Sequence, residues 1–204
     1  LQVTLLVSIM SVLLGTVIGL MAAMIKLNAD RKKKETVLSR IIHIYVDVIR
    51  GTPSVLQLMI VYFAVFHSRL GYVAAVVSFG INSGAYVAEI FRAGIQSIDK
   101  GQMEASRALG LNWFQAMRFV IMPQAFKRII PPLGNEFIAM LKDSSLVSVI
   151  GFEELTRTGQ LIISRTYAAF EIWIVVALLY LIMTLAISRF VALLEKRFSK
   201  GTRK

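Results

Sequence analysis

The first 25 residues of the chain carry no charged side chain, and this run limits what the chain can fold into. It extends from Leu1 to Ile25 and is mostly aliphatic. A helix of about 20 apolar residues crosses the roughly 30 Å hydrocarbon layer of a membrane. The run has no basic segment before it and is too long for the core of a signal peptide. It therefore predicts a membrane-spanning helix. Because the chain begins at leucine, we expect its native start to lie further upstream.

The composition of the whole chain supports insertion into a membrane. Of its 204 residues, 56% are apolar and 17% are charged, whereas soluble domains contain about 45–50% apolar and about 25% charged residues. One core could not bury this apolar excess, so lipid must solvate part of the surface. The composition excludes a disordered chain and a collagen-like fibre. The absence of cysteine excludes a disulfide scaffold, a thiol nucleophile and a cysteine-ligated metal site.

Four further segments are candidates for crossing the membrane. Residues 71–90 and 172–194 are long apolar runs, and residues 44–66 are long enough only if the apolar run Val55–Phe66 is extended backwards. The segment 129–150 is ambiguous because it contains polar and helix-breaking residues, namely Pro131, Pro132, Gly134, Glu136, Lys142 and Asp143. Hydropathy alone does not decide whether this last segment crosses.

The distribution of basic residues decides the topology. They gather in three connections: Lys26, Arg31, Lys32, Lys33, Lys34 and Arg40; then Arg92, Lys100, Arg107, Arg118, Lys127 and Arg128; and finally Lys196, Arg197, Lys200, Arg203 and Lys204. Basic connections stay in the cytoplasm, so all three lie on one side of the membrane. The chain must then cross an even number of times after Arg128, which makes 129–150 a span.

The sequence therefore predicts an all-α integral membrane protein. Residues 1–204 form a single transmembrane domain with the N-terminus outside and the C-terminus in the cytoplasm. Its five spans are expected at about 1–25, 44–66, 71–90, 129–150 and 172–194.

The fourth span is unusually polar. Charged side chains at membrane depth cost several kcal/mol unless they pair or face water. Pro131-Pro132 and the step Asp143–Ser145 favour a break in the helix, and a Ser or Asp at a break can cap a half-helix whose amides attract anions. We expect a polar pathway here. The alternative is that the span ends near Leu141 and its polar residues are solvated.

Residues 97–128 form the only sizeable connection between spans. Asp99 is a start signal for a helix over Gln102–Leu109, and Gly110 is expected to end that helix. The small side chains of this helix suit the groove of a protein partner.

A second, amphipathic helix is expected to follow in the same connection. Asn112 can cap it, and Pro123 is expected to end it. Its bulky apolar side chains would also suit the surface of a bilayer.

This connection carries the most specific motif in the chain. It reads Glu104-Ala105-Ser106, three residues, Gly110, nine residues, then Val120, Ile121, Met122 and Pro123. The motif resembles the E-A-A-x3-G-x9-I-x-L-P loop of the membrane subunits of ABC importers. Three conservative replacements depart from that pattern, namely Ser106, Val120 and Met122, and the spacing is intact.

Other segments narrow the resemblance to polar amino acid permeases. They are Arg50-Gly51-Thr52-Pro53 with Gln57, the run from Asn82 through Tyr86 to Gly94, and Lys142-Asp143-Ser144-Ser145-Leu146 through Gly151. The similarity covers essentially the whole chain.

The resemblance implies a permease subunit of an ATP-driven importer in the membrane of a bacterial cell. Such permeases work as dimers, either with an identical or with a related subunit. Two ABC ATPase subunits bind their cytoplasmic loops, and an extracytoplasmic receptor delivers the amino acid. By this resemblance the coupling helices lie between spans three and four, and the residues that carry coupling are Glu104, Ala105, Ser106 and Gly110.

The chain has no G-x4-G-K-[S/T] phosphate loop. We therefore expect it to bind no cofactor and to catalyse no reaction, with ATP and Mg²⁺ held by the partner ATPase. Because the basic residues flank spans and form no single face, no nucleic acid partner is expected.

Six residues are candidate contacts for the amino acid: Tyr62, Asn82, Ser144, Ser145, Leu146 and Glu153. The two serines offer hydroxyl groups and the leucine an apolar wall. The alternatives are that Tyr62 anchors at the interface, that Asn82 ties helices together and that Glu153 is solvated. Acidic side chains outnumber basic ones in residues 143–154, which favours a cationic amino acid.

Two other classes of membrane protein remain as alternatives. An ion-coupled secondary transporter would need a coupling-ion site and usually an internal repeat, which the chain lacks. A channel subunit would have no evident use for docking helices. An intramembrane hydrolase is disfavoured, since the chain has only two histidines and neither a G-x-S-x-G nor an H-E-x-x-H motif.

Overall fold

All secondary structure in the described part of the chain is helical. The structure, a computed structural model, describes residues 1–32 and 34–199. The elements in chain order are α1 (Gln2–Lys32), α2 (Val37–Gly51), α3 (Ser54–Ile60), η1 (Val61–Val65), α4 (Gly71–Gln96), α5 (Lys100–Ala108), α6 (Trp113–Ala116), η2 (Met117–Ile121), α7 (Met122–Asp143), η3 (Ser144–Ile150), α8 (Leu155–Thr166) and α9 (Ala169–Ser199). The η1 and η2 segments are π-helical turns and η3 is a 3₁₀ helix. The all-α prediction is confirmed. Four basic residues used for the topology lie outside the described residues: Lys33, Lys200, Arg203 and Lys204.

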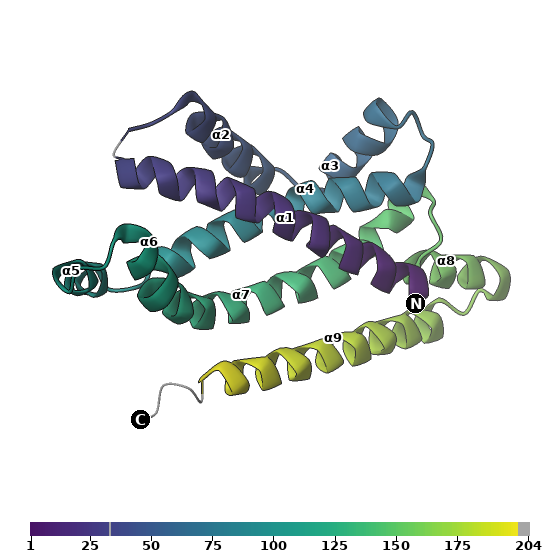
Figure 1. Cartoon of the computed structure of the whole chain (residues 1–204). Coiled ribbons are helices and arrows are strands. Elements are labelled where there is room, and N and C mark those ends of the chain that lie inside the picture. Colours follow the sequence, from purple (N-terminus) through teal and green to yellow (C-terminus); the bar gives the residue numbers. More distant parts are fainter. Residues whose placement is uncertain (33, 200–204) are drawn as a thin grey trace.

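The centre of the fold is the pair of long helices α1 and α4, which lie against each other along most of their length (Figure 1). Glycines bring the two backbones close. A Cβ atom on Gly15 would lie 2.7 Å from the Cβ of Ser83, and one on Gly19 would lie 2.6 Å from the Cβ of Val87. Glycine or another small residue is what such close packing of membrane helices requires.

Two apolar clusters lie at opposite ends of this pair. Figure 1 shows α5 and α6 at one end of the molecule and α8 at the other, here called the α5 end and the α8 end. The cluster at the α5 end joins α1, α4 and the start of α7 through Ala23, Val87, Phe91, Ile98, Ile121, Ala125 and Ile129. The cluster at the α8 end consists of Val7, Leu58, Ala75, Phe79, Met140 and Val147. Both ends of the pair are thereby held to α7.

The segment predicted as the second span, 44–66, is not one straight helix. α2 and the α3–η1 segment meet at an angle of 109°. The break falls at Thr52, whose backbone is extended (φ −119°, ψ 146°), because the ring of Pro53 disfavours a helical conformation in the preceding residue. The segment therefore forms a bent pair of short helices.

The helix of the predicted fourth span begins much earlier than expected. α6, η2 and α7 run on without interruption, so Pro123 does not end a helix, and Pro131 and Pro132 lie inside α7. The π-helical turn η2 ends at Ile121, two residues before Pro123. A wider turn of this kind relaxes the hydrogen-bond ladder at the point where a proline has no N–H to donate.

Among the described residues, three helices are long and apolar enough to cross a membrane, namely α1, α4 and α9. The bent pair formed by α2 and α3–η1 would add a fourth if it counts as one span. α7, which contains most of the predicted span 129–150, does not meet these criteria of length and composition. The predictions of five spans, of a single transmembrane domain and of the positions of the two termini therefore stay predictions.

The glycine contacts between α1 and α4 generate a stability prediction. We expect Gly15→Leu to lower the thermal midpoint of the detergent-solubilised protein by about 5 °C or more, because overpacking a tight interface costs about 1–3 kcal/mol. Gly51→Leu is the matched control, since a Cβ at Gly51 meets no atom within 4 Å. Equal midpoints for the two variants, measured by size-exclusion after heating, would contradict the close packing.

Candidate functional site

The connection between α4 and α7 presents a short helix to solvent. The side chain of Asp99 caps α5 by accepting a hydrogen bond from the amide of Gly101 at 2.7 Å. Glu104 and Ala105 are exposed on this helix, whereas Ser106 is only 4% exposed and its hydroxyl donates to the carbonyl of Gln102. The motif predicted for coupling is thus divided between an outer surface and an inner contact.

The end of α5 is a tight turn built around Gly110. Its φ of +86° lies in the left-handed region, which glycine adopts at little cost. The Gly110 amide donates to the Arg107 carbonyl, and the Leu111 amide donates to the Ser106 carbonyl. These two bonds form a Schellman motif, which satisfies carbonyls at the end of a helix.

Asn112 begins the next helix immediately after this turn. Its side chain accepts from the Gln115 amide at 2.9 Å, and the Gln115 side chain accepts from the Asn112 amide at 2.8 Å. This reciprocal capping box confirms the predicted start of the second helix. Between them, Asp99, Gly110 and Asn112 set the path of the whole connection.

The connection is held to the long helices by apolar and polar contacts. Met103 of α5 and Met117 of η2 pack against the cluster at the α5 end. The guanidinium group of Arg128 on α7 donates to the carbonyl of Ser97, which caps the end of α4. A displacement of α5 would therefore pull on both α4 and α7.

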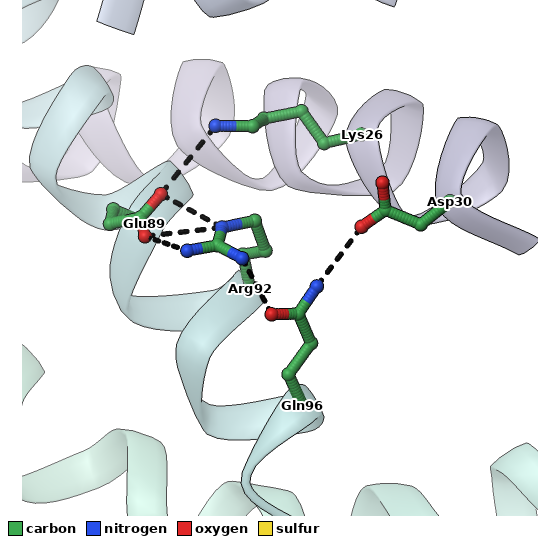
Figure 2. A network of polar contacts seen from close by, with 5 residues as sticks. All are labelled: Lys26, Asp30, Glu89, Arg92 and Gln96. Atoms are coloured by element: carbon green, nitrogen blue, oxygen red, sulfur yellow. Dashed lines mark hydrogen bonds and ion pairs between the residues drawn. The ribbon is translucent and has the colours of Figure 1, made fainter. Parts of the chain in front are cut away.

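A network of charged and polar side chains joins the C-terminal parts of α1 and α4 (Figure 2). The ammonium group of Lys26, a residue only 4% exposed, lies 3.5 Å from a carboxylate oxygen of Glu89. The same carboxylate accepts hydrogen bonds from Arg92. Gln96 then bridges the helices, accepting from Arg92 at 2.5 Å and donating to Asp30 at 3.0 Å.

The sequence analysis did not predict this network, because it treated Lys26 as a signal of orientation and Arg92 as such a signal and as part of a family motif. The available signal was spacing. Lys26 and Asp30 are four residues apart, and Glu89 and Arg92 are three apart, so each pair lies on one face of its helix. That these two faces meet follows only from the packing of α1 on α4.

The polar part of α7 differs from the expected break. Glu136, at 8% exposed, is buried and Asp143 is half-buried, whereas Lys142 is exposed. At Asp143 the α-helix tightens into the 3₁₀ helix η3, and the Asp143 side chain makes no capping hydrogen bond. The expectation of a capped half-helix at this step is therefore wrong.

The structure places the serines of the predicted substrate site on η3. Ser144 is fully buried and its hydroxyl donates to the Leu141 carbonyl at 2.7 Å. Ser145 is half-buried, and its carbonyl accepts from the hydroxyl of Ser148. Leu146 packs against the apolar cluster at the α8 end. Short 3₁₀ turns allow a serine to bond back to the carbonyl three residues earlier, which is why the Ser144 hydroxyl turns inward.

Asn82 on α4 is buried and forms a hydrogen bond that joins two helical segments. Its amide donates to the side chain of Gln57 at 2.9 Å. Gln57 in turn donates to the carbonyls of Ile49 and Thr52 and to the Thr52 hydroxyl. The two side chains thus tie α4 to the bend between α2 and α3.

Tyr62 lies in η1, half-buried, with its hydroxyl donating to the Ser68 carbonyl at 3.1 Å. Glu153 is exposed. Within residues 1–32 and 34–199, no hydrogen bond joins any two of the six predicted substrate contacts. The structure therefore spreads them over three elements and the turn before α8.

Glu154, next to Glu153, is occupied inside the fold. It is 2% exposed, caps α8 by accepting from the Arg157 amide at 2.8 Å, and accepts from the Tyr180 hydroxyl of α9 at 2.9 Å. One of the three acidic residues that favoured a cationic substrate is thus used to hold α8 to α9.

In the described part of the chain, no group of three or more Asp, Glu or His side chains is placed to hold a metal ion.

Comparisons with known proteins identify the family of the chain and its location in the inner membrane. The profile of the binding-protein-dependent transport system inner membrane component family matches residues 15–200. The glutamine transport system permease protein GlnP of Escherichia coli K12 is 45% identical over 201 residues, covering 96% of this chain and 90% of that protein.

Solved structures agree with this similarity. The crystal structure of an amino acid ABC transporter with histidines superposes with a TM-score of 0.86 at 44% identity, covering 97% of this chain and 91% of that one. The inward-facing MetNI methionine ABC transporter has the same fold, with a TM-score of 0.80 at 21% identity over 97% of this chain and 93% of that one. Neither a secondary transporter nor a channel subunit is favoured by these comparisons.

The matched profile covers most of the chain, and it describes proteins of the inner membrane, where apolar helices such as α1, α4 and α9 belong. The chain therefore belongs to the binding-protein-dependent transport system inner membrane component family, as a permease subunit of an amino acid ABC importer.

Proposed function

We propose that this permease carries polar amino acids through a path it forms as a dimer, driven by separate ATPase subunits that dock on α5. The observation that carries this proposal is the exposed pair Glu104 and Ala105 on a short helix whose two ends are capped by Asp99 and Gly110. A helix held at both ends can transmit a push to the spans without deforming. ATP and Mg²⁺ are then held by the partner, and this chain supplies the docking surface.

A dimer is supported by the surface of α9. This helix of 31 residues packs on α7 and α8 along one side, while most of its large apolar side chains are exposed. Lipid covers part of such a surface, and a second permease subunit, identical or related, covers the rest. Five spans per subunit, with the basic connections in the cytoplasm, complete this arrangement, and an extracytoplasmic receptor would deliver the amino acid to the opposite side.

The amino acid would pass along the polar side of α7. Asp143 is the partly accessible carboxylate there, and η3 adds Ser145 and Leu146 beside it. The similarity to glutamine permeases favours an amino acid with an uncharged polar side chain. A cationic amino acid is the second candidate, favoured by the exposed Glu153 and by Asp143.

The turn at Gly110 generates the central functional prediction. We expect Gly110→Leu to leave the permease inserted but to reduce ATP-driven uptake at least tenfold, because the left-handed turn orients α5 and strains any other residue. The measurement is amino acid uptake and ATP hydrolysis in vesicles that contain the permease, its ATPase and a receptor.

Gly151→Leu is the matched control, since Gly151 also has a positive φ (+75°) with no atom within 4 Å of a Cβ, at the far end of the molecule. It is expected to keep receptor-independent ATP hydrolysis at the wild-type level. Wild-type uptake together with wild-type stimulation of ATP hydrolysis in Gly110→Leu would contradict the proposal. Uptake driven by an ion gradient in the absence of ATP would contradict it as well.

The two adjacent glutamates provide a test of substrate charge. If Glu153 guides a cationic amino acid, Glu153→Gln lowers uptake of arginine and lysine several-fold and leaves glutamine uptake and thermal stability unchanged. Glu154→Ala, in contrast, is expected to destabilise the fold by about 1–3 kcal/mol, because the Tyr180 hydroxyl loses its buried acceptor. Unchanged transport of arginine or lysine by Glu153→Gln would remove the role of this side chain.

A further inference from the structure

An apolar groove of about 640 Å³ opens between α1, α4, α6 and the start of α7. Its floor includes Leu20 and Phe91, and Met24 and Phe114 on its rim are 64% and 73% exposed. The volume is within the range of small-molecule binding pockets. No residue that we assign to coupling or to the amino acid path lines it.

One end of this groove is polar and basic. The guanidinium carbon of Arg31 lies 4.6 Å from the ring centroid of Trp113, and Asn28 lines the groove one turn before Arg31. Within residues 1–32 and 34–199, Arg31 takes part in no ion pair. The carboxylate of Asp30 accepts from Gln96 and lines, together with Arg31, a neighbouring pocket and not this groove. The positive charge of Arg31 is therefore available to an anion at the mouth of the groove.

The length of the groove matches one leaflet of a membrane. Leu20 and Arg31 are 11 residues apart on α1, which corresponds to about 16 Å along a helix. Half of the hydrocarbon layer is about 15 Å thick. With α1 crossing the membrane, as its length and composition allow, the groove would run from the hydrocarbon layer to the interface, where tryptophan and arginine side chains are favoured.

We propose that this groove binds an anionic phospholipid, with an acyl chain along Leu20 and Met24 and the phosphate group at Arg31 and Asn28. The apolar lining of the groove suits an acyl chain, and the guanidinium group of Arg31, which makes no ion pair, suits a negatively charged headgroup. A protein surface would instead need partners for both Arg31 and Asn28 beside an exposed apolar rim. The site goes beyond the proposed transport function, since it concerns the lipid around the permease and not its substrate.

The chain offers a direct probe of this site because it contains two tryptophans, Trp113 in the groove and Trp173 on α9. The intact transporter with Trp173→Phe is reconstituted in vesicles containing phosphatidylglycerol or phosphatidylcholine with brominated acyl chains. The signal of a variant carrying both Trp113→Phe and Trp173→Phe is subtracted, which leaves the fluorescence of Trp113. The measured quantity is the ratio of its quenching by the two lipids at equal mole fraction.

We expect phosphatidylglycerol to be preferred about fivefold, the contribution of one basic side chain at an anionic membrane surface. Arg31→Gln should bring the ratio to about one. Arg118→Gln is the matched control, since Arg118 also lies over an aromatic ring, that of Phe119 at 5.7 Å, but does not line the groove. It should keep the preference.

Three results would overturn the proposal. A ratio of one in the protein with Arg31 intact would mean that the groove does not select anionic lipid, and this result needs no Arg31 variant to fold. An unchanged ratio in Arg31→Gln would assign any preference to other residues. Absence of quenching by either lipid would show that protein, such as a second copy of the chain, covers Trp113.

Discussion

The close approach of α1 and α4 is the contact on which the rest of the structure depends. Gly15 and Gly19 let the two helices pack closely, because side chains of α4 occupy the space that a Cβ atom at either glycine would need. At this separation the ammonium group of Lys26 reaches Glu89, and Gln96 spans from Arg92 to Asp30 (Figure 2). A buried lysine is tolerated because its charge is paired, and the pairing in turn holds the helices in register.

The α1–α4 unit also positions the candidate docking surface. Ser97 follows the last residue of α4 as its cap, and its carbonyl accepts from Arg128 of α7; the short segment to Asp99 then leads directly into α5 (Figure 1). Because one end of α5 is fixed by the side chain of Asp99, the other by the backbone turn at Gly110 and its inner side by Ser106, little freedom remains for its exposed side. Force applied there reaches α4 through the backbone and α7 through Arg128. This arrangement suits a chain that receives mechanical work from a partner.

The features that could be predicted from the sequence are those set by local chemistry. The uncharged run at the start of the chain predicted α1, and the caps at Asp99 and Asn112 depend on side chains within three residues of the amides that they bind. The left-handed turn at Gly110 follows in the same way from one residue type. The exposed position of Glu104 leaves its carboxylate accessible for the contact that its motif implies.

Features that depend on packing between distant segments could not be predicted. Pro123 and Pro131 were expected to stop or break a helix, yet the π-helical turn and the neighbouring helices accommodate them. Glu154 was counted with Glu153 as an acidic side chain near the path, but its partner Tyr180 lies 26 residues away. Asn82 likewise meets Gln57 only because α3 folds back on α4.

The central claim, that α5 presents its exposed side to an ATPase subunit, can be tested by cross-linking. The 204 residues contain no cysteine, so a single introduced thiol, labelled before assembly, can carry a short photoactivatable cross-linker without background from these residues. Ala105→Cys, on the exposed side, should be joined to the ATPase subunit in the assembled, transport-active complex, while Ser106→Cys, on the buried side, should not. Failure of Ala105→Cys to capture the ATPase in such a complex, or equal capture from both positions, would contradict the account.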